Sequence, residues 1–145
     1  MKSKEITESI FRKYCSKNNW YCLKLAIDRS LIKASGLNFA KSMPCDFLVF
    51  KDDVIEFVEV KEVKTNDSFF NSRFKQQFRM TKLYNRLNKK IYKFYVLINF
   101  IKYNKTFKIP VNEYNILIQN KKSLKIVEIP NEFEIKLLDK KNINN

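Results

Sequence analysis

The segment at residues 91–101, IYKFYVLINFI, constrains the fold most strongly. Almost all of its residues are apolar or aromatic, yet the run is shorter than the ~18 residues that a membrane span needs. A short, continuous apolar run is typical of a strand that is buried on both faces in the middle of a sheet. Such a strand must be covered from both sides, which predicts an α/β domain with a mixed central β-sheet flanked by helices.

The rest of the chain supplies elements for one such domain. Its 145 residues are enough for one compact unit, which we expect over residues 1–138, with 139–145 as a disordered tail. Ile6, Ile10 and Tyr14 recur at helical spacing and predict a first helix. The expected helices are 3–18, 68–89 and 112–120, and the expected strands are 20–27, 45–50, 54–60, 91–101 and 105–109, with one or two more between 124 and 137.

Two of these elements carry further expectations. The strands at 45–50 and 54–60 are joined by a short polar segment, Lys51–Asp53, which predicts a β-hairpin. The helix over 68–89 is expected to be amphipathic. Its apolar face is predicted to comprise Phe70, Phe74, Phe78, Thr81, Tyr84 and Leu87.

The absence of histidine and the near absence of glycine exclude several classes of enzyme. Without histidine the chain has no Ser-His-Asp triad, no Cys-His pair and no His-ligated zinc. A single glycine, Gly36, excludes a P-loop and a dinucleotide fingerprint, which need several glycines for close backbone approach to phosphates. Any catalysis must therefore use Asp, Glu, Lys, Tyr, Ser, Thr or Cys side chains, and we expect it to use a metal.

The cysteines and the N-terminus indicate a cytoplasmic protein. Cys15, Cys22 and Cys45 are odd in number and form no C-x-x-C pair, so we expect small buried thiols instead of disulfides or a zinc site. The N-terminal residues contain no apolar signal-peptide region. We therefore expect a cytoplasmic location, or the host cytoplasm if the chain is encoded by a virus.

Positive charge is concentrated in the second half of the chain. The 29 Lys and Arg residues against 15 Asp and Glu give a net charge of +14, which suits a polyanionic partner. Residues 1–72 contain 12 basic and 10 acidic residues, whereas residues 73–145 contain 17 and 5, and none of the acidic ones lies between Asp67 and Glu113. We favour nucleic acid over a membrane surface, because a basic helix in so short a chain needs its apolar face for the core. The candidate phosphate contacts are Arg73, Lys75, Arg79, Lys82 and Arg86, followed by Lys89 and Lys90.

The predicted hairpin brings three charged residues together. Asp46 opens its first strand, while Glu59 and Lys61 lie two residues apart near the end of its second strand and therefore share one face. Two carboxylates and the backbone carbonyl of Val60 form an all-oxygen ligand set for Mg²⁺, which Mn²⁺ can replace. A lysine beside that metal is suited to orient or deprotonate a water molecule. The arrangement favours metal-assisted hydrolysis of phosphodiester bonds.

These residues also resemble a known signature. Pro44-x-Asp46, followed thirteen positions later by Glu59-Val60-Lys61, resembles the signature of the PD-(D/E)XK nucleases, and most closely that of archaeal Holliday junction resolvases and their viral and bacterial relatives. The resemblance covers residues 5–101. It implies a restriction-endonuclease-like fold, cleavage of branched DNA such as a four-way junction, and a homodimer. Cys45 departs from the signature, because it separates the proline from the aspartate.

The resemblance implies roles for further residues. A glutamate on the first helix completes the metal site, which points to Glu8, with Glu5 as the alternative. A glutamine on the helix after the E-x-K strand lies near the active site, which points to Gln77, with Gln76 as the alternative. A segment between the first two strands contacts DNA, and its candidates are Ser35, Lys33 and Lys41, with Ser30 and Ser42 as alternative serines.

Two sets of alternatives stay open at this point. The E-x-K element is repeated directly by Glu62-Val63-Lys64. We prefer Glu59 and Lys61 because the apolar run Val54–Val60 places them at the end of a strand, whereas the second set leads into a polar loop. The alternative functions are another DNA nuclease of the same fold, a non-catalytic nucleic-acid-binding protein, and an enzyme that acts on RNA.

Overall fold

The computed structural model describes residues 3–25 and 45–137, with side chains from Ile6 onward. A six-stranded mixed sheet with the strand order β1-β2-β3-β5-β6-β8 forms the centre, and β4 and β7 form a separate two-stranded sheet. The helices are α1 (Ser3–Lys17), α4 (Gln77–Arg86) and α5 (Val111–Leu117), with 3₁₀ turns η1 (Asn71–Arg73), η2 (Ile101–Tyr103), η3 (Ile126–Glu128) and η4 (Asn131–Phe133). The strands are β1 (Tyr21–Lys24), β2 (Phe47–Phe50), β3 (Ile55–Val63), β4 (Ser68–Phe70), β5 (Tyr92–Phe100), β6 (Lys105–Pro110), β7 (Ser123–Lys125) and β8 (Glu134–Ile135).

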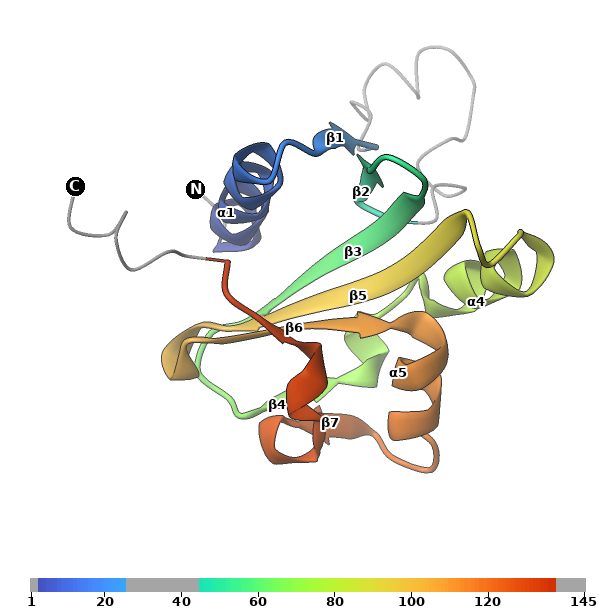
Figure 1. Cartoon of the computed structure of the whole chain (residues 1–145). Coiled ribbons are helices and arrows are strands. Elements are labelled where there is room, and N and C mark those ends of the chain that lie inside the picture. Colours follow the sequence, from blue (N-terminus) through green and yellow to red (C-terminus); the bar gives the residue numbers. More distant parts are fainter. Residues whose placement is uncertain (1–2, 26–44, 138–145) are drawn as a thin grey trace, which may run out of the picture.

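Strand β5 is the central strand that the apolar run predicts. It lies between β3, with which it pairs in parallel, and β6, with which it pairs antiparallel. Val96, Leu97 and Ile98 are completely buried, so both faces of the strand are covered. The predicted mixed sheet flanked by helices is confirmed (Figure 1).

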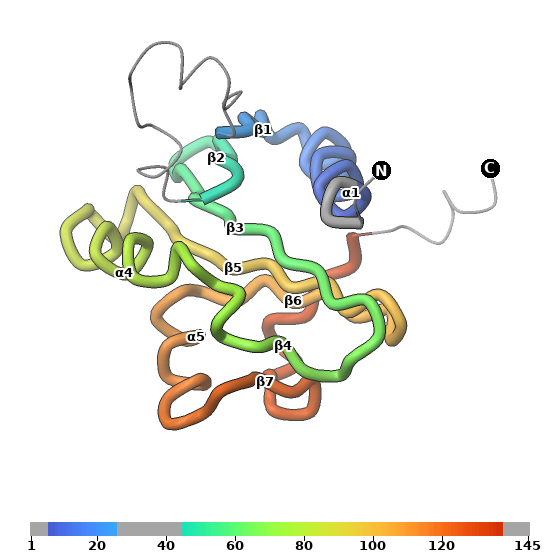
Figure 2. The backbone as a smooth tube through the Cα atoms, turned by 180° about the vertical axis from the view of Figure 1, so that it is seen from behind, coloured from blue at the N-terminus to red at the C-terminus, as the bar shows by residue number. Residues whose placement is uncertain are grey.

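The two faces of the sheet pack against different elements. Helix α1 covers one face, and α4, α5 and the β4–β7 pair lie on the other, as both backbone views show (Figures 1 and 2). Val58 and Val60 of β3 belong to the hydrophobic cluster on the α1 side. Phe57 and Val63 pack into the cluster on the α4 and α5 side. Alternation along β3 therefore assigns each of its side chains to one of these two faces.

The helix predicted over 68–89 is wrong over its first nine residues, because α4 begins only at Gln77, and it ends at Arg86. Ser68–Phe70 instead form β4, where Phe69 pairs with Leu124 of β7 and is completely buried. Phe70 and Phe78, both predicted on the apolar face, are 48% and 70% exposed. Pairing with a segment more than fifty residues away overrides the local helical pattern, and no local periodicity reports such a partner.

The predicted hairpin is confirmed, but its second strand is longer than predicted. Strands β2 and β3 pair antiparallel, and the Lys51 N–H donates to the Val54 carbonyl at 3.0 Å in the turn. Strand β3 continues to Val63, beyond the predicted end at residue 60, because it pairs with β5 over its full length. None of the helices in the described ranges is both long and apolar enough to cross a membrane.

Candidate active site and nucleic-acid interface

The start of β2 places Asp46 beside β3. Phe47 pairs with Val58 in the antiparallel register, so Asp46 lies across from Glu59. The Val60 N–H donates to Oδ2 of Asp46 at 2.8 Å. The Asp46 carbonyl accepts a hydrogen bond from the Leu25 N–H at 2.8 Å. Asp46 is therefore held both by the end of β1 and by the middle of β3.

Glu59 and Lys61 share one face of β3, as their spacing predicts. Nζ of Lys61 lies 3.1 Å from Oε2 of Glu59, and their side chains are 12% and 1% exposed. The thiol of Cys45 lies close to both carboxylates. Burial raises the pKa of this thiol most, and the negative charges of Glu59 and Asp46 raise it further. The hairpin thus gathers two carboxylates and one ammonium group in a largely buried place.

The oxygen atoms at this place fit a hard cation. The N–H and C=O of one strand residue point to the same side, so the Val60 carbonyl lies on the side of Asp46. Together with the carboxylates of Asp46 and Glu59 it forms the oxygen ligand set that Mg²⁺ and Mn²⁺ prefer. Within residues 3–25 and 45–137, no three Asp, Glu, His or Cys side chains converge as a metal-binding group. The described donor set is therefore two carboxylates and one carbonyl.

Glu8 lies on the α1 side of the sheet. Its buried carboxylate forms an ion pair with Lys24, with 2.9 Å between Oε2 and Nζ. Lys24 pairs with Phe47 across β1 and β2, so this ion pair is one residue away from Asp46 in the sheet. The structure does not bring Glu8 together with Asp46 and Glu59 into one acidic cluster of three. The side chain of the alternative, Glu5, lies outside the described side chains.

The second E-x-K element faces the other way. Glu62 is buried on the α1 side, where its carboxylate accepts a hydrogen bond from the Thr7 hydroxyl. Asn99 donates to that same hydroxyl oxygen at 3.3 Å. The reason that the sequence offers for preferring Glu59 and Lys61, a strand that ends at residue 60, is wrong. Alternation along β3 separates the two sets, because it directs Glu62 away from the face that carries Glu59.

The two candidate glutamines have different surroundings. The Gln77 side-chain amide donates to Oδ1 of Asn115 at 2.8 Å, and Asn115 donates to Oγ1 of Thr81 at 3.0 Å. Gln77 therefore belongs to the contact between α4 and α5. Gln76 has a buried side-chain oxygen that accepts no hydrogen bond from the described residues. It lies one turn before Met80, whose side chain is completely buried.

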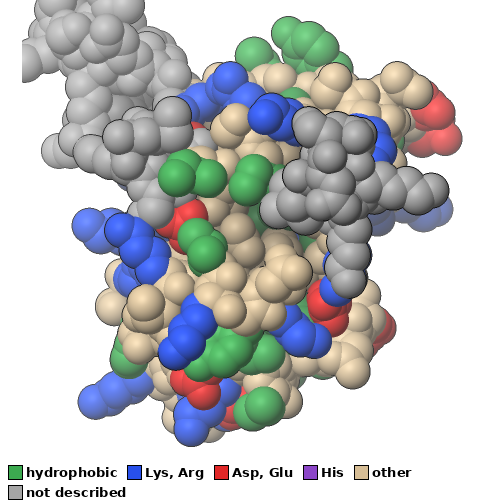
Figure 3. Space-filling view, turned by 90° about the vertical axis from the view of Figure 1, so that its left-hand side faces the viewer, with side chains coloured by type: hydrophobic (Ala, Val, Ile, Leu, Met, Phe, Trp, Pro, Cys, Tyr) green, Lys and Arg blue, Asp and Glu red, His purple; other side chains and the backbone are tan. Residues whose placement is uncertain are grey.

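The predicted basic residues of the α4 region all reach the surface. The five candidates Arg73, Lys75, Arg79, Lys82 and Arg86 are exposed. Phe78 lies among them, with Nζ of Lys82 4.9 Å from its ring centroid. On the face seen in Figure 3 acidic side chains stand among the basic ones, whereas the chain from residue 68 to residue 112 has no acidic residue. The α4 region thus combines unmixed positive charge with an exposed aromatic ring.

Sequence reasoning missed Phe78 because it counted this residue with the core. The signal that was available is its position: Lys82 lies four residues later on the same side of α4, and Lys75 lies three residues earlier, just before the helix begins. The remaining DNA-contact candidates are on the segment between β1 and β2. Ser35, Lys33 and Lys41, and the alternatives Ser30 and Ser42, lie outside the described residues.

Comparison with solved structures supports the predicted resemblance at the level of the fold. The chain is similar to Hjc from Archaeoglobus fulgidus, a Holliday junction resolvase from an archaeal hyperthermophile, with a TM-score of 0.56 and 12% sequence identity. The match covers 90% of this chain and 93% of the resolvase chain. No protein-family model and no curated protein matches the sequence. The fold therefore resembles that of an archaeal Holliday junction resolvase, as predicted.

Proposed function

We propose that this protein is a metal-dependent endodeoxyribonuclease that cleaves branched DNA, with a four-way junction as its first substrate. The observation that carries the proposal is the grouping of Asp46, Glu59 and Lys61 by the β2–β3 hairpin. That grouping occurs on a fold that resembles a protein described as a Holliday junction resolvase. The carboxylates suit metal binding, and the ammonium group suits the positioning of water. Metal-assisted hydrolysis of a phosphodiester needs both.

Each residue of the group has a distinct task. Asp46, Glu59 and the Val60 carbonyl would hold Mg²⁺ or Mn²⁺, and such an ion neutralises phosphate charge and lowers the pKa of a bound water. The Val60 N–H fixes the orientation of the Asp46 carboxylate. Lys61, held at Glu59, orients the attacking water toward phosphorus. Glu8 assists from α1 at the edge of the site, since its partner Lys24 is next to the start of β2.

Substrate binding is assigned to the basic α4 region and to the segment before β2. The exposed cations of α4 contact phosphates and give affinity with little sequence preference. Ser35, Lys33 and Lys41 are proposed to contact the DNA near the cleaved bond. We assign the glutamine role to Gln76, because the amide of Gln77 is engaged with Asn115. A homodimer is proposed because a four-way junction has two equivalent strands to cut.

The test compares labelled junction, flap, duplex and single-stranded DNA, and one RNA duplex, each with Mg²⁺ or with EDTA. We expect paired symmetric nicks in the junction that depend on the metal. Asp46→Asn should lower the cleavage rate by at least about 100-fold, because it removes a charged metal ligand. The same variant should bind the junction at least as tightly as the wild type, because it removes a negative charge that repels phosphate.

Glu62→Gln is the matched control, since it neutralises a buried carboxylate on the same strand but on the opposite face. It should retain cleavage. If Asp46→Asn cuts at a rate near that of the wild type, the assignment of the site is wrong. If the wild type binds the junction but cuts no substrate in Mg²⁺ or Mn²⁺, the nuclease proposal is wrong. The remaining hypothesis is then a non-catalytic nucleic-acid-binding protein.

A further inference from the structure

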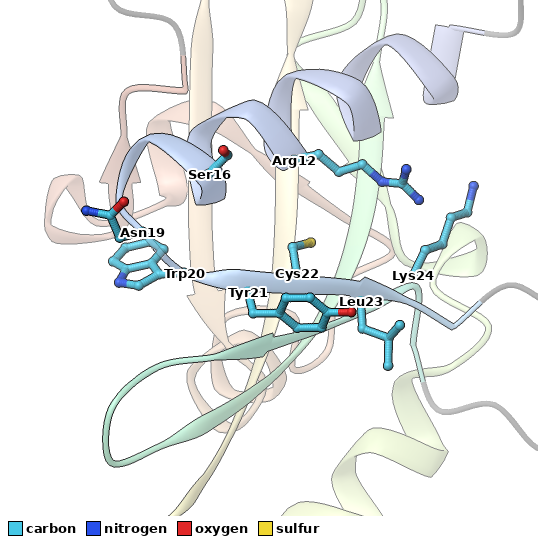
Figure 4. A pocket seen from close by; sticks show the side chains of 8 residues that line it. All are labelled: Arg12, Ser16, Asn19, Trp20, Tyr21, Cys22, Leu23 and Lys24. Carbon is cyan, nitrogen blue, oxygen red and sulfur yellow. The ribbon is translucent and has the colours of Figure 1, made fainter.

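Two of the three cysteines face each other where α1 meets β1. Cys15 is in the last turns of α1 and is buried, and Cys22 lies in β1. The connection between them is short and ordered: the Trp20 N–H donates to the Cys15 carbonyl at 2.9 Å, and Asn19 adopts a left-handed conformation. Figure 4 shows the Cys22 side chain directed from its strand toward α1. Cys22 packs against the hydrophobic cluster that contains Cys15.

The two sulfur atoms differ in their access to solvent. Cys22 is half-buried and lines an open surface pocket together with Arg12, Trp20 and Lys24 (Figure 4). Cys15 is buried and belongs to the hydrophobic cluster on the α1 side of the sheet. A small solute in the pocket therefore meets the Cys22 sulfur first.

The surroundings also make the two thiols chemically unequal. The hydrogen bond from Cys15 lowers the pKa of Cys22 most; the positive charge of Arg12 lowers it further, and partial burial works against both. The pKa of Cys15 is raised by the same hydrogen bond and by burial. Cys22 therefore has both the lowered pKa and the access to solvent, which favour its reaction with oxidants, and Cys15 is the resolving thiol beside it.

We propose that Cys15 and Cys22 are a site of reversible oxidation, at which a peroxide converts the two thiols into an intramolecular disulfide. The Cys22 thiolate attacks one peroxide oxygen, the O–O bond breaks, and a sulfenic acid and water form. The Cys15 sulfur then attacks the Cys22 sulfur, the S–O bond breaks, and hydroxide leaves with the Cys15 proton as water. The two sulfurs lose two electrons in total, and one peroxide becomes two waters. A dithiol reductant reverses the step.

The disulfide would join two elements that border the candidate active site. Helix α1 carries Glu8, and β1 carries its ion-pair partner Lys24, two residues after Cys22. The oxidation site goes beyond the proposed nuclease function and does not depend on it, since it requires only the packing of α1 on β1. It also corrects the expectation that all three cysteines are buried, because Cys22 borders a pocket.

The third cysteine provides an internal control. Cys45 is buried in the cluster on the opposite side of the sheet, and its pKa is raised chiefly by burial. Its sulfur donates to the Phe47 carbonyl at 3.2 Å. A buried thiol of this kind reacts slowly with peroxide. Selective oxidation of Cys15 and Cys22 over Cys45 is therefore the specific expectation.

The experiment treats the full chain with a small excess of hydrogen peroxide and follows intact mass, free thiols and tryptic peptides. The intact mass should fall by two hydrogen atoms, and the thiols that react with a maleimide should fall from three to one. Trypsin cleaves after Lys17, between the two cysteines, so the product should contain a Cys15 peptide linked to a Cys22 peptide. Dithiothreitol should restore all three thiols.

Variants locate the reaction. Cys45→Ser should form the disulfide as the wild type does, and Cys22→Ser should not form it. Cys15→Ser should stop at the Cys22 sulfenic acid, which dimedone traps. The proposal is overturned if the wild type gains oxygen at Cys22 without linkage to Cys15, if it forms only disulfides between chains, or if Cys45 is modified first. The wild-type result decides the proposal even if a serine variant fails to fold.

Discussion

Replacing Glu56 with glutamine should destabilise the fold strongly, although Glu56 lies outside the candidate active site. Glu56 is 4% exposed, and its side chain lies on the α1 face of β3. Nζ of Lys108 in β6 is 2.6 Å from Oε1, and Nζ of Lys51 in the hairpin turn is 3.0 Å from Oε2. One buried anion therefore holds two cations that come from separate parts of the sheet.

The size of the effect follows from burial. Breaking a buried ion pair by removing one partner costs about 3–5 kcal/mol, because the other charge stays out of water. The Lys108 side chain is only 13% exposed, so its ammonium group is largely shielded from water. Glu56→Gln also leaves the ammonium groups of Lys108 and Lys51 beside each other, and these two charges repel. We therefore expect a loss of about 4 kcal/mol, a large part of the total stability of about 5–15 kcal/mol.

The loss should shrink as the pH rises. The pKa of Lys108 is already below its usual value, because burial outweighs the favourable charge of Glu56. Without that charge the pKa of Lys108 falls further. The penalty is therefore complete below the new folded-state pKa, shrinks as the pH rises above it, and is gone only above the ordinary lysine pKa of 10.5 that applies in the unfolded chain. Lys51 lowers the pKa of Lys108 further. The nearby acids Tyr95, whose pKa is raised to about 12, and Cys15, whose pKa is also raised, stay neutral in this range.

Urea unfolding measures the effect, with circular dichroism and the fluorescence of Trp20 as probes. Trp20 is the one tryptophan of the chain, and Nζ of Lys51 is 3.8 Å from its ring centroid. With an m-value of about 2 kcal/mol per molar urea, the midpoint should fall by about 2 M. The double variant Glu56→Gln/Lys108→Met should recover most of the loss, because neither partner of the buried pair is then charged.

Lys136→Met is the matched control. Lys136 pairs with Glu134 at 3.1 Å, but its side chain is 76% exposed, so its removal should not change the midpoint measurably. The reasoning is refuted if the free energy of unfolding of Glu56→Gln lies within about 0.5 kcal/mol of the wild-type value. It is refuted equally if the double variant is less stable than Glu56→Gln alone, since a buried unpaired cation is then not the cause.

Two further predictions concern the α4 region. Replacing both Arg79 and Arg86 with glutamine should weaken binding to all branched substrates alike and flatten the log–log salt dependence of binding by about 1.8, since each lost phosphate contact contributes about 0.9; an unchanged slope in a titration against salt would exclude these contacts. Phe78→Ala should weaken binding by about 1–3 kcal/mol through lost base stacking while leaving the unfolding midpoint in place, because the ring is 70% exposed. Phe74→Ala, which truncates a buried ring, should instead destabilise the fold by about 3–5 kcal/mol, and equal effects of the two variants on stability would contradict the assignment.

The sequence pattern predicts best where side-chain chemistry alone decides the structure. The apolar run of β5 predicts a strand that is buried on both faces, and the structure has such a strand. The segment 68–76 is predicted wrongly because its structure depends on β7, more than fifty residues away. Single-sequence periodicity reports which residues share a face, but it does not report which distant segment covers that face.

In the candidate site too, local spacing predicts some positions and distant packing decides others. Asp46, Glu59 and Lys61 belong to one hairpin, so spacing and alternation suffice to group them. The positions of Glu8 and of the two glutamines depend on how α1 and α4 are rotated against the sheet. A helix side chain one position away points about 100° elsewhere around the axis, which separates Gln76 from Gln77. Motif resemblance proposes such residues, and only the packed structure reports what each one contacts.

The charged residues of β3 show why burial and charge do not by themselves identify a functional residue. Glu56 and Glu62 are as deeply buried as functional carboxylates often are, yet each one bonds to a different element of the fold: Glu56 to β6 and the hairpin turn, and Glu62 to α1. Glu59 is on the opposite face, where its ion-pair partner Lys61 comes from its own strand and Asp46 lies across from it. Two carboxylates and a lysine in one largely buried place are costly for folding and suited to holding a cation and a water, and this is why we propose the group as the active site.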